Sequence, residues 1–341
     1  MIDLPHAIGV LAQSRDLSGQ EMEEVMGIVM EGKATPAQIG AFVIALRIKG
    51  EAVEELAAAA RVVRKFASKV VVSSENLADI VGTGGDGARL FNVSTASALV
   101  AAGAGVVIAK HGNRAVTGNT GSADVLEAGG VNIDLTPDQV SETIETIGNG
   151  YMFAPVHHGA FRHLVGPRRE IGVRTMFNLL GPLTNPAGAK HQLVGVFDQK
   201  WVRPLAEVFR SLGSIHTLVV HSNDGLDEIS IAGPTNVSEL KNGQILDYVI
   251  SPEEYGFARQ PIDSLRVDSV KDSFELISGM LSGARGPAYD MIALNAGATI
   301  YAANLKESLK EGVVEACKVI DSGTALKKFQ ELAEFTTRFR Q

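Results

Sequence analysis

The sequence is poor in cysteine: its 341 residues include one, Cys317. A single cysteine cannot form an internal disulfide or build a thiolate zinc cage, so a reducing compartment is favoured. The first residues carry Asp3 and no positive charge before Arg15, which is not the pattern of a secretory signal. We therefore expect a cytoplasmic protein.

Positive charge is also scarce, since 31 Lys and Arg residues stand against 39 Asp and Glu residues and give a net charge of −8. The lack of a basic block excludes a broad surface for nucleic acid or anionic membranes, but not a local basic pocket. One uncharged stretch, residues 90–109, is long enough to span a membrane. Its Asn, Ser, Thr and Gly residues favour a helix, a turn and a buried strand instead, so we expect no membrane segment.

Proline is sparse, at 12 residues, whereas glycine is abundant, at 36. Glycine therefore makes up about a tenth of the chain, against a usual share of about 7%. No repeat accompanies the excess, which excludes collagen-like and linker sequences. The glycines must lie in turns, or where the backbone approaches a ligand.

The first seventy residues predict helices, because Ser18 with Glu21 and Thr35 with Gln38 form capping boxes before apolar runs. After Lys69, short apolar runs alternate with helical patterns, which is typical of an α/β domain around a mainly parallel sheet. We expect strands at 78–81, 106–109, 192–197, 217–221 and 291–294, and helices at 94–103, 122–129, 136–147, 199–212 and 304–320. The predicted organisation is a small helical domain, residues 1–70, joined by part of 168–190, and an α/β domain, residues 71–341.

The loop after the first predicted strand is rich in glycine, running from Gly82 to Gly87. Its G-x-G-x-x-G spacing alone suggests a dinucleotide site, but no helix opens at once and no acid occurs from Val93 through Gly121. It is not a Walker A loop either, since no G-K-[ST] follows. Four glycines do allow backbone N–H groups to converge on an anion, although a tight turn without a ligand explains them too.

Two further segments have the same chemistry. Asn92–Thr95 precedes a helical run and places side-chain donors at a helix N-terminus, where a plain N-cap is the simpler reading. Lys110–Arg114 follows the next predicted strand with two cations and a histidine. Strand-end loops of a parallel sheet lie at one edge, so three such segments together predict a ligand with more than one phosphate.

Asp227 and Glu228 follow a predicted strand and offer the hard oxygen ligands that Mg²⁺ prefers, or else form a hydrated acidic turn. His157 and His158 lack a third ligand at a recognisable spacing, so zinc is unsupported and we interpret them as structural or pocket-lining. Arg168 is suited to clamp a carboxylate, or to pair with a neighbouring acid. No activated nucleophile is present.

In combination and order, these motifs resemble the anthranilate phosphoribosyltransferase family along nearly the whole chain. The segments that carry the resemblance are Gly82–Asp86, Asn92–Thr95, Lys110–Arg114, Gly121–Glu127, Arg168–Pro186 and Asp227–Glu228. The resemblance implies a helical small domain, an α/β large domain like that of nucleoside phosphorylases, and a homodimer. It also implies transfer of a phosphoribosyl group from phosphoribosyl pyrophosphate to the amine of anthranilate, in tryptophan biosynthesis.

The resemblance further implies site residues. For the phosphoribosyl donor these are Gly82, Gly85, Asp86, Asn92, Val93, Ser94, Thr95, Lys110, His111, Gly112, Asn113, Arg114, Ala115, Val116, Thr117, Gly118 and Ser122. For anthranilate they are Gly82, Asn113 and Arg168, and for Mg²⁺ they are Ser94, Asp227 and Glu228. Leu90 and Gly129 depart from the family pattern, which commonly has threonine and leucine there, and we leave Leu90 out of the site.

No catalytic side chain is expected, because an aromatic amine is already neutral near pH 7 and electrostatic stabilisation of the leaving group suffices. A pyrimidine nucleoside phosphorylase has a similar architecture, but Asp227, Glu228 and the Arg168 segment argue against it. A nucleic-acid-binding relative of the same fold would show a basic face and eroded metal acids. This chain has neither feature, and small-molecule substrates are its expected partners.

Overall fold

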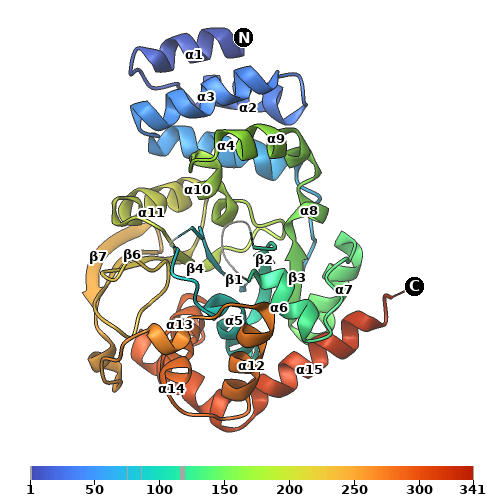
Figure 1. The fold of residues 1–341 in the computed structure, drawn as a ribbon, viewed down its shortest axis with the longest axis vertical. Helices are drawn as coiled ribbons and strands as arrows, with labels where there is room; N and C mark the ends of the chain where they lie inside the picture. Colours follow the sequence, from blue (N-terminus) through green and yellow to red (C-terminus); the bar gives the residue numbers. More distant parts are fainter. Residues whose placement is uncertain (1, 75, 86, 116–119, 341) are drawn as a thin grey trace.

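The computed structural model describes residues 2–74, 76–85, 87–115 and 120–340. It has two parts, a helical unit at the top of Figure 1 and a larger unit built on a sheet below it. The larger unit contains the β-sheet and the helices around it, so the fold matches the small helical and large α/β parts expected from the sequence.

Capping signals define the first helices. The helices are α1 (Leu4–Ala12), α2 (Gly19–Met30), α3 (Pro36–Lys49) and α4 (Val53–Phe66). Ser18 and Thr35 accept hydrogen bonds from the N–H groups of Glu21 and Gln38, and both capping boxes are complete, as predicted.

Two helices from the middle of the chain pack against this bundle. Helix α9 (Arg162–Ile171) contacts α3, and α10 (Met176–Leu183) contacts α3 and α4. Phe42, Leu46 and Phe177 belong to the hydrophobic core that these helices share. The chain therefore enters the helical unit twice, and the segment after α10 returns to the sheet.

The sheet has seven strands in the order β3-β2-β1-β4-β5-β6-β7 among the residues that the structure describes. The strands are β1 (Leu77–Gly82), β2 (Val107–Gly112), β3 (Asn149–Phe153), β4 (His191–Gly195), β5 (His216–Ser222), β6 (Thr235–Lys241) and β7 (Gln244–Ile250). Strands β1 to β5 pair in parallel, and β6 and β7 add antiparallel pairs at one edge. The sheet is thus mainly parallel, as predicted. The loops after β1, β2 and β5 all leave from the carboxyl ends of parallel strands and so lie on the same side of the sheet.

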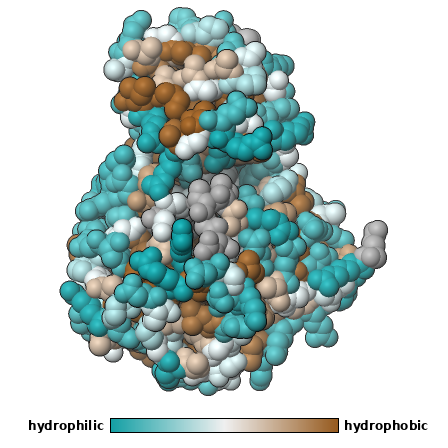
Figure 2. Space-filling model, in the orientation of Figure 1, coloured by the Kyte–Doolittle hydropathy of each residue, from teal (hydrophilic) through white to brown (hydrophobic). Residues whose placement is uncertain are grey.

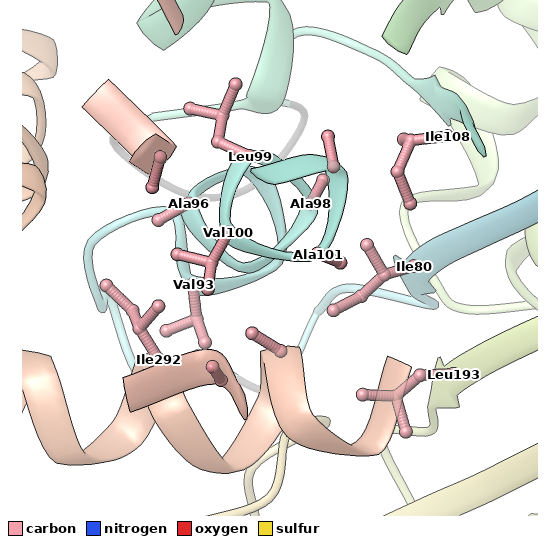
Figure 3. Packing of buried hydrophobic residues seen from close by; sticks show 14 of the residues in the cluster. Ile80, Val93, Ala96, Ala98, Leu99, Val100, Ala101, Ile108, Leu193 and Ile292 are labelled. Atoms are coloured by element: carbon pink, nitrogen blue, oxygen red, sulfur yellow. The ribbon is translucent and has the colours of Figure 1, made fainter. Parts of the chain in front are cut away.

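Helices cover both faces of the sheet. They are α5 (Val93–Gly103), α6 (Ser122–Ala128), α7 (Pro137–Ile147), α8 (Ala154–His157), α11 (Val202–Ser211), α12 (Val270–Leu281), α13 (Pro287–Ala302), α14 (Leu309–Asp321) and α15 (Thr324–Thr337). Short 3-10 turns lie at Gly159–Phe161, Gln199–Trp201, Pro252–Tyr255 and Asp263–Leu265. Figure 3 shows α5 in the core beside Ile80, Ile108 and Leu193 of the sheet and Ile292 of α13.

One expected strand is wrong. Residues 291–294 lie inside α13, whose 16 residues are almost all buried. A helix buried on all sides has no polar face, so a short apolar window from it looks like a buried strand. Gly297 allows this packing, because a Cβ there would collide with the Val313 backbone of α14.

The uncharged stretch 90–109 folds as predicted into a helix, a turn and a strand, namely α5 and the first part of β2. Within the described ranges, no helix has both the length and the apolar character needed to cross a membrane.

Candidate functional site

The glycine loop after β1 is interlocked with the loop after β5. The Gly84 N–H donates to Asp227 Oδ2 at 2.7 Å, across 143 positions of the chain. A Cβ on Gly82 would collide with the same carboxylate, and a Cβ on Gly195 of β4 would collide with the Asp227 backbone oxygen. Glycine is therefore required where these loops approach, and Asp227 lies against the predicted phosphate loop.

Positive backbone dihedrals shape the same loop. Gly84 and Gly85 have φ values of +66° and +81°, which other residues rarely adopt. A guanidinium lies beside the loop, since a Cβ on Gly85 would be 3.1 Å from Arg174 Nε. Arg174 also stacks over the Phe197 ring at 4.7 Å from its centroid. Sequence reasoning did not single out Arg174, because its approach to the loop is a tertiary contact.

The N-terminus of α5 begins with Asn92 as its cap. Asn92 Oδ1 accepts hydrogen bonds from the Thr95 N–H, at 3.2 Å, and from the Thr95 hydroxyl. Ser94 Oγ accepts one from Lys110 Nζ at 3.2 Å. The N–H groups of Val93 and Thr95 donate to the Phe91 carbonyl and to Asn92, which leaves the Ser94 N–H and the helix dipole to favour an anion at this end. The Val93 side chain is buried in the core below.

Lys110 lies below the site rather than on its surface. It is 4% exposed, and its ammonium donates to the Ile80 carbonyl at 2.6 Å as well as to Ser94. Burial lowers the pKa of Lys110, while the charges of Asp79 and Glu228 raise it. Lys110 therefore interacts with Ser94 through a hydrogen bond and with Glu228 through its charge.

The loop after β2 is tied to the start of α6. Ser122 Oγ lies 2.9 Å from the Tyr151 hydroxyl and donates to the Asn113 carbonyl at 3.2 Å. Arg114 forms ion pairs with Asp124, at 3.0 Å, and with Glu127. Hydrogen bonds to Glu127 and Asp124 raise the pKa of Arg114 and hold its half-exposed side chain against α6.

Further contacts fix the ends of this loop. The Ala115 N–H donates to Asp124 Oδ2 at 3.1 Å, and a Cβ on Gly112 would collide with Ser122. Four predicted site residues, Asp86, Val116, Thr117 and Gly118, lie outside the described residues.

Arg168 lies on α9 at the boundary of the two units. It is half-buried over the Phe177 ring, 5.7 Å from the centroid, and burial lowers its pKa. Edge-to-face ring contacts lead from Phe177 through Phe161 and His158 to His111, with centroid distances of 6.0, 5.7 and 5.0 Å. This aromatic row joins the predicted carboxylate clamp to the end of β2.

The histidines of this row are in an environment that favours their neutral form. Burial lowers the pKa of His158 to about 4, and it lowers those of His111 and His157 as well. In the part of the chain that the structure describes, no group of three or more His, Cys, Asp or Glu residues could hold a metal ion.

The donor set fits a magnesium ion bound partly by a ligand. Asp227 and Glu228 carry hard carboxylate oxygens, and Ser94 adds a hydroxyl from α5. Mg²⁺ typically keeps waters and takes phosphate oxygens in addition to one or two carboxylates, so a full protein cage is not required.

Asp79 of β1 is the buried acid that sequence reasoning missed. It is fully buried, and burial raises its pKa to about 6. In the sequence it is a single acid inside an apolar run, Ala78-Asp79-Ile80-Val81. Such an acid could equally lie on the solvent-exposed side of an edge strand, so the sequence alone does not assign it to a site.

Two family models match the chain. Residues 74–326 match the glycosyl transferase family a/b domain, and residues 5–67 match the glycosyl transferase family helical bundle domain. An anthranilate phosphoribosyltransferase from Methylococcus capsulatus is 56% identical over 338 residues, covering 99% of each chain. One from Marinomonas is 56% identical over 340 residues, covering 99% of this chain and 98% of the relative.

Solved structures agree. The anthranilate phosphoribosyltransferase of Thermus thermophilus has a TM-score of 0.92 and 44% identity, covering 97% of this chain and 99% of its own. The enzyme of Saccharomyces cerevisiae, solved in complex with PRPP and Mg, has a TM-score of 0.90 and 26% identity, covering 98% of both chains. A second yeast structure, in complex with 4-fluoroanthranilate, has a TM-score of 0.89 and 25% identity.

Proposed function

The chain belongs to the anthranilate phosphoribosyltransferase family, and from this premise we propose which of its residues carry the reaction. The enzyme transfers the phosphoribosyl group of phosphoribosyl pyrophosphate to the amine of anthranilate, in tryptophan biosynthesis. The observation that supports our placement of the site best is the contact between Asp227 and the glycine loop, because it joins the expected metal ligand to the expected pyrophosphate loop.

The donor binds at the carboxyl ends of β1 and β2 in this proposal. Phosphate oxygens are bound at the Gly85 end of the glycine loop and at the N-terminus of α5, which carries partial positive charge, while the Thr83 and Gly84 N–H groups hold the loop on Gly195 and Asp227. Lys110 supplies a cation from below, and Ser122 with the Lys110–Ala115 loop closes the other side. Asp86 and 116–118 complete the proposed donor set from outside the described residues.

Mg²⁺ is the proposed cofactor, held by Asp227, Glu228 and Ser94. When bound, it neutralises charge that develops on the pyrophosphate leaving group. The protein's own contribution is preorganised: Asp227 already accepts the Gly84 N–H, and Ser94 is already oriented by Lys110. Such fixed donors and charges need no reorganisation as the reaction proceeds.

Anthranilate binds on the side of the helical unit, with its carboxylate at Arg168 and further contacts at Asn113 and the Gly82 backbone. A planar guanidinium can bind a carboxylate through two parallel hydrogen bonds. Holding the carboxylate in this way orients the neutral amine toward the sugar, so that orientation replaces a general base.

We further propose a cytoplasmic homodimer with a domain boundary near residue 70. Helices α9 and α10 join the helical domain by their packing on α3 and α4. Support for a second copy comes from the helical unit, where Figure 2 shows hydrophobic residues gathered on one face. Ile48 of α3 and Val165 of α9 are exposed apolar side chains of this unit, with 80% and 61% of their surfaces accessible.

The assay that tests the function follows the loss of anthranilate fluorescence on addition of phosphoribosyl pyrophosphate and Mg²⁺. Fluorescence should fall only when enzyme, donor and Mg²⁺ are all present. A fall of equal rate without the donor, or no fall in the complete mixture, would contradict the function. Equal rates with and without Mg²⁺ after chelation would contradict the cofactor.

A further inference from the structure

Strands β1 and β2 lie side by side but share backbone pairing only at the start of β1. Strand β1 pairs with β4 over five positions, from Ala78 opposite His191 to Gly82 opposite Gly195. With β2 it pairs only at Leu77 and Ala78. The two loops proposed to hold the donor leave from the ends of these strands, so the backbone ladder between β1 and β2 stops beneath the donor site.

Where the ladder stops, side chains form hydrogen bonds with the backbone groups of the neighbouring strand. Asp79 Oδ1 accepts a hydrogen bond from the His111 N–H at 3.2 Å, and Lys110 Nζ donates to the Ile80 carbonyl at 2.6 Å. Buried backbone groups must find partners, and here side chains of each strand supply them to the other. The His111 N–H and the Ile80 carbonyl therefore have hydrogen-bond partners although the ladder has stopped.

Asn185 is the third member of this cluster and comes from the segment that leaves α10 for β4. Its Nδ2 donates to Asp79 Oδ2 at 2.8 Å and to the Ala109 carbonyl at 2.9 Å. Its Oδ1 accepts from the Ala187 N–H at 2.9 Å, which fixes the orientation of the amide. We call Asp79, Lys110 and Asn185 the polar wedge.

Burying the polar wedge costs more folding free energy than burying apolar side chains of similar volume would. Asp79 is 0% exposed and Asn185 is 3% exposed. Burying a carboxylate carries a desolvation penalty, and hydrophobic residues of similar volume often replace buried ion pairs without loss of stability. An ordinary backbone ladder would join the two strands without a buried carboxylate, so the wedge calls for an explanation other than stability.

We propose that Asp79 and Asn185 are positioning residues of the donor site, which fix the spacing of the β1 and β2 ends and so place the two loops that bind the phosphoribosyl donor. The inference rests on the proposed donor site. Neither residue touches the substrate in this account: Asp79 acts through His111 and Lys110, and Asn185 acts through Asp79 and the Ala109 carbonyl. Because Asn185 lies in the segment that returns from the helical unit, the wedge also fixes that segment to the donor loops.

Asp79→Asn tests the wedge with little change in volume. The new amide places an N–H₂ group against the Asn185 N–H₂ group, or loses the acceptor for the His111 N–H. We expect the KM for phosphoribosyl pyrophosphate to rise about fivefold or more, with the KM for anthranilate changed less than about twofold. Asn185→Ala, which removes the other arm of the wedge, should shift the donor KM in the same direction.

Glu239→Gln is the matched control. Glu239 is also a buried carboxylate, and it accepts hydrogen bonds from His216, Tyr248 and Tyr301 near the amino end of β5, away from the strand-end loops. Its substitution should lower the melting temperature and leave the donor KM unchanged. Melting temperatures of all variants, with and without pyrophosphate and Mg²⁺, provide a readout independent of turnover.

The wedge variants, the control and the wild type together distinguish three outcomes. A raised donor KM and a reduced stabilisation by pyrophosphate in Asp79→Asn and Asn185→Ala, but not in Glu239→Gln, support the wedge; if Asp79→Asn does not fold, Asn185→Ala decides. Lowered melting temperatures with a donor KM within about twofold of wild type would overturn it. Wild-type protein that neither turns over nor is stabilised by pyrophosphate would instead contradict the donor site itself.

Discussion

At the scale of single residues, the site is distinguished by where its charges are buried. Lys110 is almost fully buried and oriented by Ile80 and Ser94, while Arg168 is half-buried over an aromatic ring. A buried cation is fixed before substrate arrives, whereas Arg168 keeps access to a ligand. The two cations therefore suit different tasks, a fixed field for the donor and a clamp for the acceptor.

The Arg168→Ala variant tests the clamp. Loss of a hydrogen bond to a charged group costs about 1.5–3 kcal/mol, so the KM for anthranilate should rise by roughly 10-fold to 150-fold. The donor KM should stay close to that of wild type. Arg169→Ala, at the exposed neighbouring position, is the control. An unchanged anthranilate KM in Arg168→Ala would remove Arg168 from the acceptor site.

Predictability at this scale depends on sequence separation. The glycines, Asn92, Lys110 and Asp227 stand next to strand ends, and local patterns are enough to single them out. Asp79 and Asn185 lie 106 positions apart and meet only through the fold. A lone acid in an apolar strand and an asparagine before a proline carry no local sign of their pairing.

At the scale of elements, helix caps and strand–helix alternation follow the local sequence closely. The capping boxes at Ser18 and Thr35 predict their helices correctly, and four of the five apolar strand runs lie in strands of the sheet. Prediction fails for elements whose hydrophobic pattern is set by tertiary packing rather than by one buried and one exposed face. Strand β6 carries the polar residues Ser238 and Glu239 at buried positions, and β7 is a largely exposed edge strand. Helix α13 is buried on almost every side.

Gly129 gives a test of element packing. It ends α6, and a Cβ there would collide with the Phe329 ring of α15. The aromatic ring of Phe329 therefore fills the space that a side chain at position 129 would take. Gly129→Leu should cost about 1–3 kcal/mol of unfolding free energy through overpacking.

A double variant checks the cause. Phe329→Ala alone leaves a cavity, and Gly129→Leu with Phe329→Ala should be more stable than the sum of the two single effects predicts. Urea unfolding of the four proteins measures this coupling. Strictly additive free energies would show that the two side chains do not compete for the same space.

At the scale of the whole molecule, buried histidines should control stability in mild acid. Burial holds the pKa of His158 at about 4 in the folded protein, against an ordinary value near 6.5. The unfolded chain then binds more protons between these values, so stability is lost as pH falls through that window. His158 alone should reduce the unfolding free energy by about 2 kcal/mol between pH 7 and pH 5.

Asp79 acts in the opposite direction over part of the same range. Its folded pKa of about 6 lies above the ordinary value of 3.8, so its contribution to stability falls as pH rises toward 6. This opposes the histidine effect by about 1 kcal/mol. The lowered pKa values of His111 and His157 add to that of His158.

Urea unfolding at pH 7 and pH 5 measures the balance. The wild type should be less stable at pH 5, and His158→Gln should show a smaller loss than wild type. Equal stability at the two values in the wild type would contradict the neutral, buried state of the histidines.

The central claim is that the loop after β1 and the acids after β5 form one donor–metal site. The most direct measurement is calorimetric titration of phosphoribosyl pyrophosphate at several Mg²⁺ concentrations. Wild type and the Asp263→Asn control, at a side chain 82% exposed to solvent, should bind the donor more tightly as Mg²⁺ rises. Asp227→Asn combined with Glu228→Gln should bind it weakly and independently of Mg²⁺, and the same Mg²⁺ dependence as in wild type would contradict the account.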